Sequence, residues 1–127
     1  MRVAGIAAVT LLAVVEVFQI ALALGAPFGK ASWGGKHKGV LPIRLRTASG
    51  VAALLVYPLI TLFVLAASGL IDSSLTEGRR RVGMWVLTAF FAVGALANFV
   101  SRSIIERIWG PVTLGLAVCC GLIARGI

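Results

Sequence analysis

Acidic side chains are scarce in this chain of 127 residues. It has four Asp and Glu against twelve Lys and Arg, with one histidine and two cysteines. The acids lie far apart in the sequence, at Glu16, Asp72, Glu77 and Glu106. We recognise no ligand cluster for a metal ion, no Ser-His-Asp arrangement and no carboxylate pair for acid–base catalysis. The sequence therefore predicts no metal site, no cofactor and no catalytic residue, and it favours a protein that is not an enzyme.

Charge of either sign is also rare. Only 13% of the residues are charged and 60% are hydrophobic, whereas about a quarter of a soluble domain is charged. This composition predicts a single-domain, multi-pass protein of a cell membrane, and the high use of Ala, Gly, Val and Arg points to a bacterial inner membrane. The net charge is +8. Because the cations lie between apolar runs, we expect anionic lipid headgroups as partners and no nucleic acid.

Four apolar runs predict an all-α fold, a compact bundle of four transmembrane helices. The helices are expected over about residues 3–24, 48–71, 82–100 and 106–124, close to the ~20 residues that cross a bilayer. Four crossings would place the N and C termini on the same side. Seven cations on the side of the first loop against five on the other leave the orientation open. A cleaved signal peptide is the alternative for the first run, although Glu16 interrupts its apolar core.

Some local signals refine this picture. Pro58 predicts a kink in the second helix, and Ser74 with Glu77 forms a candidate capping box before the third. Cys119 and Cys120 are adjacent in an apolar run, so we expect them to pack as small side chains without forming a disulfide.

The longest break between apolar runs covers residues 25–47, GAPFGKASWGGKHKGVLPIRLRT. Its start has one residue too few for a phosphate-binding loop, and Ala31 stands where that motif needs Ser or Thr. Glycines interleaved with aromatic residues favour an ordered segment at the interface, and a plain cationic surface loop is the alternative. The side chains expected to contact headgroups or to belong to a functional loop are Lys30, Trp33, Lys36, His37, Lys38, Arg44 and Arg46.

Glu16 is the strongest functional signal in the sequence. It lies well inside the first apolar run, where a charge is costly, so it should face the bundle and be paired or protonated. Counting depth along the helices predicts a ligand or proton site built from Glu16, Gln19, Tyr57, Asn98 and Arg102, beneath the basic loop. The alternatives are hydrogen bonds that only tie helices together and, for Arg102, a side chain that snorkels to headgroups.

Two stretches, APFGKASWGGKHKGVLPIRLR at 26–46 and NFVSRSIIERIWGPV at 98–112, carry a resemblance. With the apolar runs around them, they resemble a family of small bacterial four-helix membrane proteins of unknown function, so the resemblance implies a fold but no activity. The architecture is also similar to the small multidrug resistance transporters, which have a carboxylate in the first helix as Glu16 is here. The chain lacks their Tyr-Ala-Trp-Gly pattern in the second helix, so this second likeness is an analogy.

Several functions fit these features. The favoured one is non-enzymatic binding or transport of a small molecule or lipid through the polar cluster around Glu16, beneath the basic loop. In the transport form Glu16 would exchange a proton for substrate, and the protein would act as a homodimer. The alternatives are an accessory or structural subunit of a larger membrane complex and a small lipid-modifying membrane enzyme.

Overall fold

The computed structural model describes residues 1–127 and contains helices and turns but no strand. Five α-helices are joined by short 3₁₀ turns and one π-helical segment. In chain order the elements are α1 (Arg2–Ala23), η1 (Gly29–Ala31), η2 (Trp33–Gly35), α2 (Ile43–Val51), the π segment η3 (Ala52–Val56), α3 (Tyr57–Ala67), α4 (Glu77–Phe99), η4 (Glu106–Ile108) and α5 (Trp109–Ala124).

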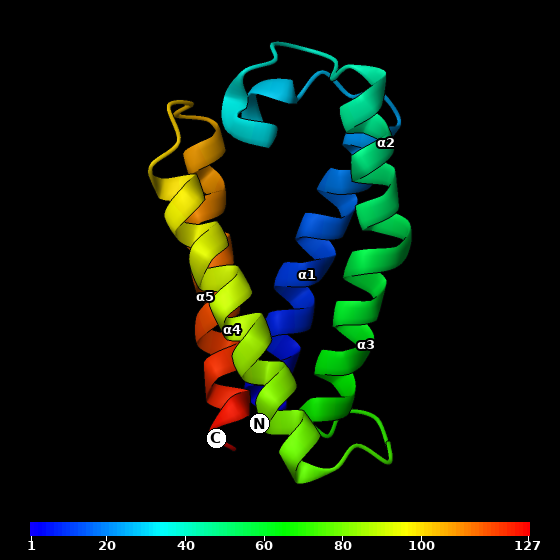
Figure 1. The fold of residues 1–127 in the computed structure, drawn as a ribbon, viewed down its shortest axis with the longest axis vertical. Helices are drawn as coiled ribbons and strands as arrows, with labels where there is room; N and C mark the ends of the chain where they lie inside the picture. Colours follow the sequence, from blue (N-terminus) through cyan, green and yellow to red (C-terminus); the bar gives the residue numbers. More distant parts are fainter.

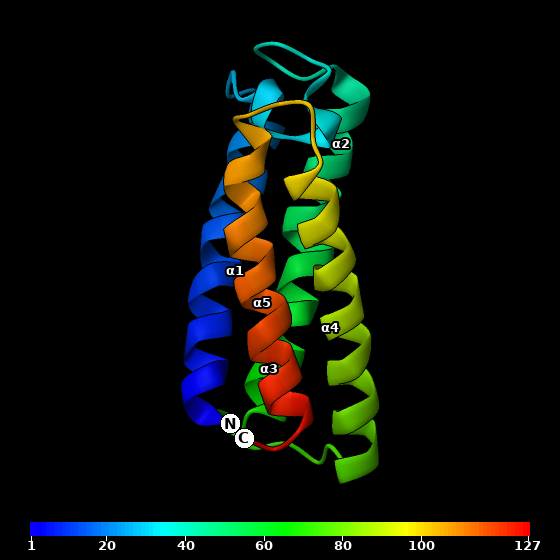
Figure 2. The same ribbon diagram turned by 90° about the vertical axis from the view of Figure 1, so that its left-hand side faces the viewer.

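Four helical stretches are long and apolar enough to cross a membrane, which confirms the all-α bundle of four spans. They cover Arg2–Ala23, Ile43–Ala67, Glu77–Phe99 and Glu106–Ala124. Successive spans run in opposite directions, and both termini lie at one end of the bundle (Figures 1 and 2). The segment between α1 and α2 lies at the other end, beside the connection between α4 and α5.

The predicted limits of the middle two helices are wrong at their starts. The second helical stretch begins at Ile43 instead of residue 48, and it ends at Ala67 instead of residue 71. The third begins at Glu77 instead of residue 82, because Thr76 is its N-cap and accepts a hydrogen bond from the backbone N–H of Arg79 at 3.3 Å. The capping box expected at Ser74 is therefore not formed. Hydropathy locates the apolar part of a helix, whereas the cap decides where the helix begins.

Pro58 disturbs its helix as expected, but the disturbance is a short change from α-helical to π-helical backbone. Proline has no N–H for the helical hydrogen-bond ladder, and its ring crowds the preceding turn. The residues just before it, Ala52–Val56, form a π-helical segment that joins α2 to α3. Such a local rearrangement supplies backbone partners inside an apolar span, where water is not available to do so.

Small residues line the contacts between the spans. Ala4 and Ala8 of α1 and Ala117 and Cys120 of α5 are buried in the core, and both cysteines are free. A Cβ at Gly5 would overlap the side chain of Ser68. Small side chains let helix backbones approach closely, which is how helices associate in a membrane. The prediction that the two cysteines pack as small side chains is confirmed, since Cys120 lies in the core and Cys119 packs against it.

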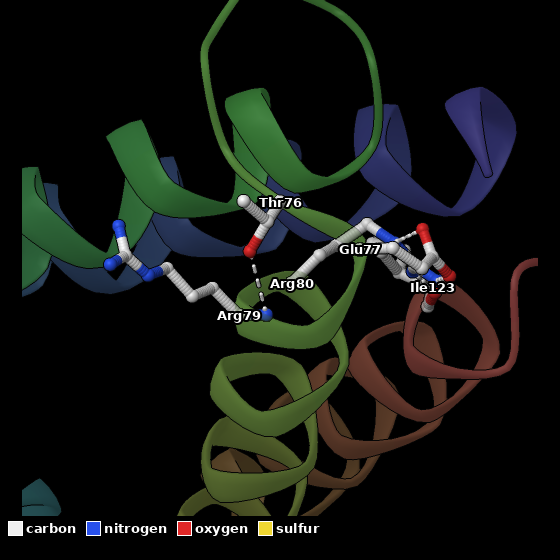
Figure 3. A network of polar contacts seen from close by, with 5 residues as sticks. All are labelled: Thr76, Glu77, Arg79, Arg80 and Ile123. Atoms are coloured by element: carbon white, nitrogen blue, oxygen red, sulfur yellow. Dashed lines mark hydrogen bonds and ion pairs between the residues drawn. The ribbon is translucent and has the colours of Figure 1, made fainter.

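At the end that holds the termini, Arg80 ties α4 to α5 (Figure 3). Its guanidinium donates to both carboxylate oxygens of Glu77, at 3.0 and 2.5 Å, and also to the carbonyl oxygen of Ile123 near the end of α5. The Arg80 side chain is buried. Glu77 is the only carboxylate in an ion pair, and its partner Arg80 joins α4 to α5 through the Ile123 carbonyl.

Replacing Arg80 with Met should destabilise the fold. The change removes a charge-assisted contact between α4 and α5, and a hydrogen bond to a charged group contributes about 1.5–3 kcal/mol. We expect the free energy of unfolding in detergent, measured by thermal or denaturant titration, to fall by that amount. Arg79→Met is the matched control, since the Arg79 side chain is exposed. An equal effect of the two substitutions would contradict the assigned role of Arg80.

Candidate functional site

A cavity of about 250 Å³ lies between the spans at the end opposite the termini. We call it the loop cavity, because residues of the α1–α2 segment close it. Val15, Phe18 and Ala31 supply apolar wall. Its polar and aromatic lining comes from every span and from the loop, namely Gln19, Ser32, Trp33, Tyr57, Asn98, Glu106, Trp109 and Thr113.

The segment that closes the cavity is folded. The Gly29 N–H donates to the Gly39 carbonyl at 2.7 Å, and the Ser103 hydroxyl donates to the Lys30 carbonyl at 2.6 Å. Ala31 and Ser32 are buried. A Cβ at Gly29 would lie 2.5 Å from the carbonyl oxygen of His37, so only glycine fits there. Of the two interpretations of residues 25–47, the ordered segment agrees with the structure.

Trp33 is fixed over the cavity by one hydrogen bond. Its indole N–H donates to the hydroxyl of Ser49 at 3.0 Å, and Ser49 is fully buried in α2. Trp33 has a backbone φ of 49°, a value that residues other than glycine rarely adopt. With its N–H engaged, the indole offers the cavity only its ring.

Glu106 gives the cavity a buried carboxyl group. The residue is 7% exposed, and its Oε2 is buried with no hydrogen-bond partner in the protein. Gln19 Oε1 and Trp109 Nε1 are in the same condition. Three of the four buried side-chain polar atoms without a partner therefore belong to residues that line this one cavity. Native proteins leave few such groups, so their concentration here needs an explanation.

Local hydrogen bonding explains why the Glu106 carboxyl is free. Ser103 and Glu106 have the spacing of a capping box, in which the Glu side chain normally accepts from the backbone N–H of the Ser. Half of the box is present, since the Glu106 N–H donates to the Ser103 hydroxyl at 3.3 Å. The Ser103 N–H, however, donates to the Ser101 hydroxyl at 3.2 Å. Because that donor is occupied, the carboxyl group of Glu106 is left for the cavity.

Aromatic rings make up much of the remaining wall. The rings of Phe18 and Trp109 are tilted against each other with centroids 4.5 Å apart, and Phe28 stacks on the other side of Phe18 at 6.5 Å. Tyr57 is partly buried against the core and lines the cavity from α3. Trp109 and Trp33 are thus wall residues of the cavity.

The structure assembles only part of the polar cluster predicted from the sequence. Gln19, Tyr57 and Asn98 line the loop cavity, and the Asn98 amide donates to the Thr113 hydroxyl at 3.3 Å. Glu16 instead lies in a separate groove between α1 and α3, and its Oε1 is buried without a partner. Arg102 is exposed and follows the end of α4.

The cations of the loop are directed away from the cavity. Lys30, Lys36, Lys38 and Arg44 are exposed, and none of them lines it. His37 is half-buried and also lies outside the lining. Arg46 has a structural contact, since its Nε donates to the carbonyl of Ala23 at the end of α1, at 3.3 Å. An anionic headgroup bound by these cations would therefore sit on the outside of the loop.

Comparison with models of protein families, with curated proteins and with solved structures finds no match to this chain.

Replacing Ser49 with Ala should loosen the segment over the cavity. The change removes the acceptor of the Trp33 indole, and a hydrogen bond contributes about 1 kcal/mol. Local opening of residues 29–38 should then be about fivefold more frequent, as measured by amide hydrogen exchange in detergent. Ser73→Ala is the control, since Ser73 is exposed at the opposite end of the bundle. Unchanged exchange in Ser49→Ala would show that the Trp33 contact does not hold the loop.

Proposed function

We propose that the protein binds a small polar molecule in the loop cavity and does not transform it chemically. The observation that carries the proposal is the set of unpartnered buried atoms, Gln19 Oε1, Glu106 Oε2 and Trp109 Nε1, in residues around one cavity. A buried polar group without a partner costs about 1–3 kcal/mol. A ligand with polar groups opposite these atoms recovers that cost on binding.

The make-up of the wall supports a binding site. Apolar and aromatic side chains with a few convergent polar groups are the usual composition of a small-molecule site. Two further hydroxyl groups are already engaged, since Ser32 donates to the Gly29 carbonyl and Thr113 donates to the Trp109 carbonyl. The polar groups left over for a ligand are therefore an amide oxygen, a carboxylate oxygen, an indole N–H and the hydroxyl of Tyr57, which makes no hydrogen bond within the protein.

The cavity lies near one end of the bundle. The wall is built from the ends of the spans and from the folded segment that follows α1, at the end away from the termini (Figure 1). A site there lies close to the membrane–water interface. The composition supports a cell membrane as its location, and specifically a bacterial inner membrane.

Binding can be measured by the fluorescence of the protein's own tryptophans. Trp33 and Trp109 line the cavity, whereas Trp85 lies on the outer face of α4, so Trp85→Phe leaves only cavity reporters. Three probes share one ring and differ in headgroup charge: benzylammonium, benzyl alcohol and benzoate. We expect at least one of them to change the tryptophan fluorescence saturably, and Thr113→Leu, which fills part of the cavity, to abolish the change.

Thr61→Leu is the control for that experiment. It makes the same substitution in the groove that holds Glu16, outside the loop cavity, and should leave the titration unaltered. Absence of saturable binding by all three probes would contradict the proposed function. So would binding that survives Thr113→Leu in a protein of unaltered thermal stability.

Transport is the second candidate, favoured by Glu16. Its carboxylate oxygen Oε1 is buried without a partner in a spanning helix, and acids in that situation commonly carry protons in transporters. The Glu16 groove adjoins the loop cavity along two helices, because Pro58 follows Tyr57 and Gln19 is one turn from Glu16. In this form of the proposal a proton on Glu16 is exchanged for the ligand.

Substitution of Glu16 separates transport from binding. In liposomes with a proton gradient, the wild type should accumulate benzyltrimethylammonium, a permanent cation that does not cross a bilayer as a neutral base. Glu16→Gln should reduce that accumulation to the level of empty liposomes, while saturable probe binding in detergent persists. Accumulation that persists in Glu16→Gln would overturn proton exchange at this residue.

A further inference from the structure

We propose that the ligand of the loop cavity is a small organic cation, a protonated amine, with Glu106 as its counter-ion. This inference rests on the proposed function and adds the class of ligand. It depends on three properties of the cavity: the free acceptors, the aromatic wall and the absence of any cation from the lining.

The free acceptors match an ammonium group. Glu106 Oε2 and Gln19 Oε1 are both buried oxygen atoms without a donor. An ammonium group carries several N–H donors and no acceptor, so its donors suit the two oxygens, while the free N–H of Trp109 calls for an acceptor elsewhere on the ligand. Hydrogen bonds between charged partners are about twice as strong as neutral ones. A carboxylate ligand would instead place its own oxygens against these two acceptors.

The aromatic wall also favours a cation. The rings of Trp33, Tyr57 and Trp109 line the same cavity as Glu106. The face of an aromatic ring is electron-rich and attracts a positive charge within about 6 Å of its centre, and Trp is the best of the three types. Because the Trp33 N–H is committed to Ser49, that ring can act on a ligand only through its π system.

No cation of the protein takes the place of the ligand. Although the chain has twelve Lys and Arg, none lines the cavity, and the only ion pair is Arg80–Glu77 at the other end of the bundle. The nearest guanidinium in the sequence, that of Arg107, donates to the Ser101 carbonyl at 2.8 Å. The exposed lysines outside the cavity favour anions there, so the inner and outer surfaces of the loop differ in the charge they attract.

The three matched probes test the ligand class directly. In the Trp85→Phe background, benzylammonium should bind about tenfold or more tightly than benzyl alcohol, and benzoate should bind most weakly. Glu106→Gln keeps the shape of the side chain and removes its charge. In that variant benzylammonium should lose its advantage, while the affinity for benzyl alcohol changes by less than about twofold. Asp72→Asn makes the same acid-to-amide change at an exposed residue outside the cavity lining; it is the control and should retain the wild-type order.

The outcomes separate this inference from the proposed function. If benzyl alcohol or benzoate binds as tightly as benzylammonium and Thr113→Leu blocks it, the cavity is a binding site but not one for cations. If no probe binds, the proposed function fails as well. Should Glu106→Gln be too unstable to titrate, the order of the three probes in the parent protein still decides the class. A preference for benzylammonium that persists in a folded Glu106→Gln protein would overturn the role of Glu106.

Discussion

The absence of water around the spans is the constraint on which this structure depends. Inside a bilayer each backbone N–H and C=O must find its partner in the protein, and helices achieve this within a single segment. The four spans do so, with one departure at the π-helical segment before Pro58. Other irregular backbone lies toward the ends of the bundle (Figure 2). The longer stretch of it is the segment between α1 and α2, whose residues close the loop cavity. The site is thus found where the solvent permits non-helical structure.

The sequence was sufficient to predict the fold because the need to cross a water-free bilayer shows directly in the amino-acid composition of each span. A run of about 20 apolar residues can do little else than span a membrane, and α1 and the Glu106–Ala124 span were located almost to the residue. The starts of the other two spans were missed because Arg44, Arg46 and Arg79 are helical although they are polar. A charged first turn at the membrane surface is stable, so hydropathy alone places the start of a helix too late.

The candidate site was only partly predictable, and particular residues show why. The prediction that Arg102 and Asn98 belong to one site assumed that the helix continues to Arg102, but α4 ends at Phe99. Glu16 was expected beneath the loop because depth along a helix can be counted, whereas the direction it faces depends on packing against α3. Glu106 was not among the site residues predicted from the sequence. Its spacing from Ser103 was a usable signal, but the competing hydrogen bond from the Ser103 N–H to the Ser101 hydroxyl could be found only in three dimensions.

The distribution of charge separates a structural acid from a functional one. Glu77 is paired with Arg80 within α4, and the same guanidinium donates to the Ile123 carbonyl of α5. Glu106 is next to Arg107 in sequence, yet that guanidinium is bonded to a backbone carbonyl, and the Glu106 Oε2 is buried without a donor. Burying a charge without a partner costs free energy. The chain has twelve cations that could serve as such a partner. Glu106 lies in a cavity that four aromatic residues line and the loop closes, and its unpaired state is best explained if the missing positive charge belongs to a ligand.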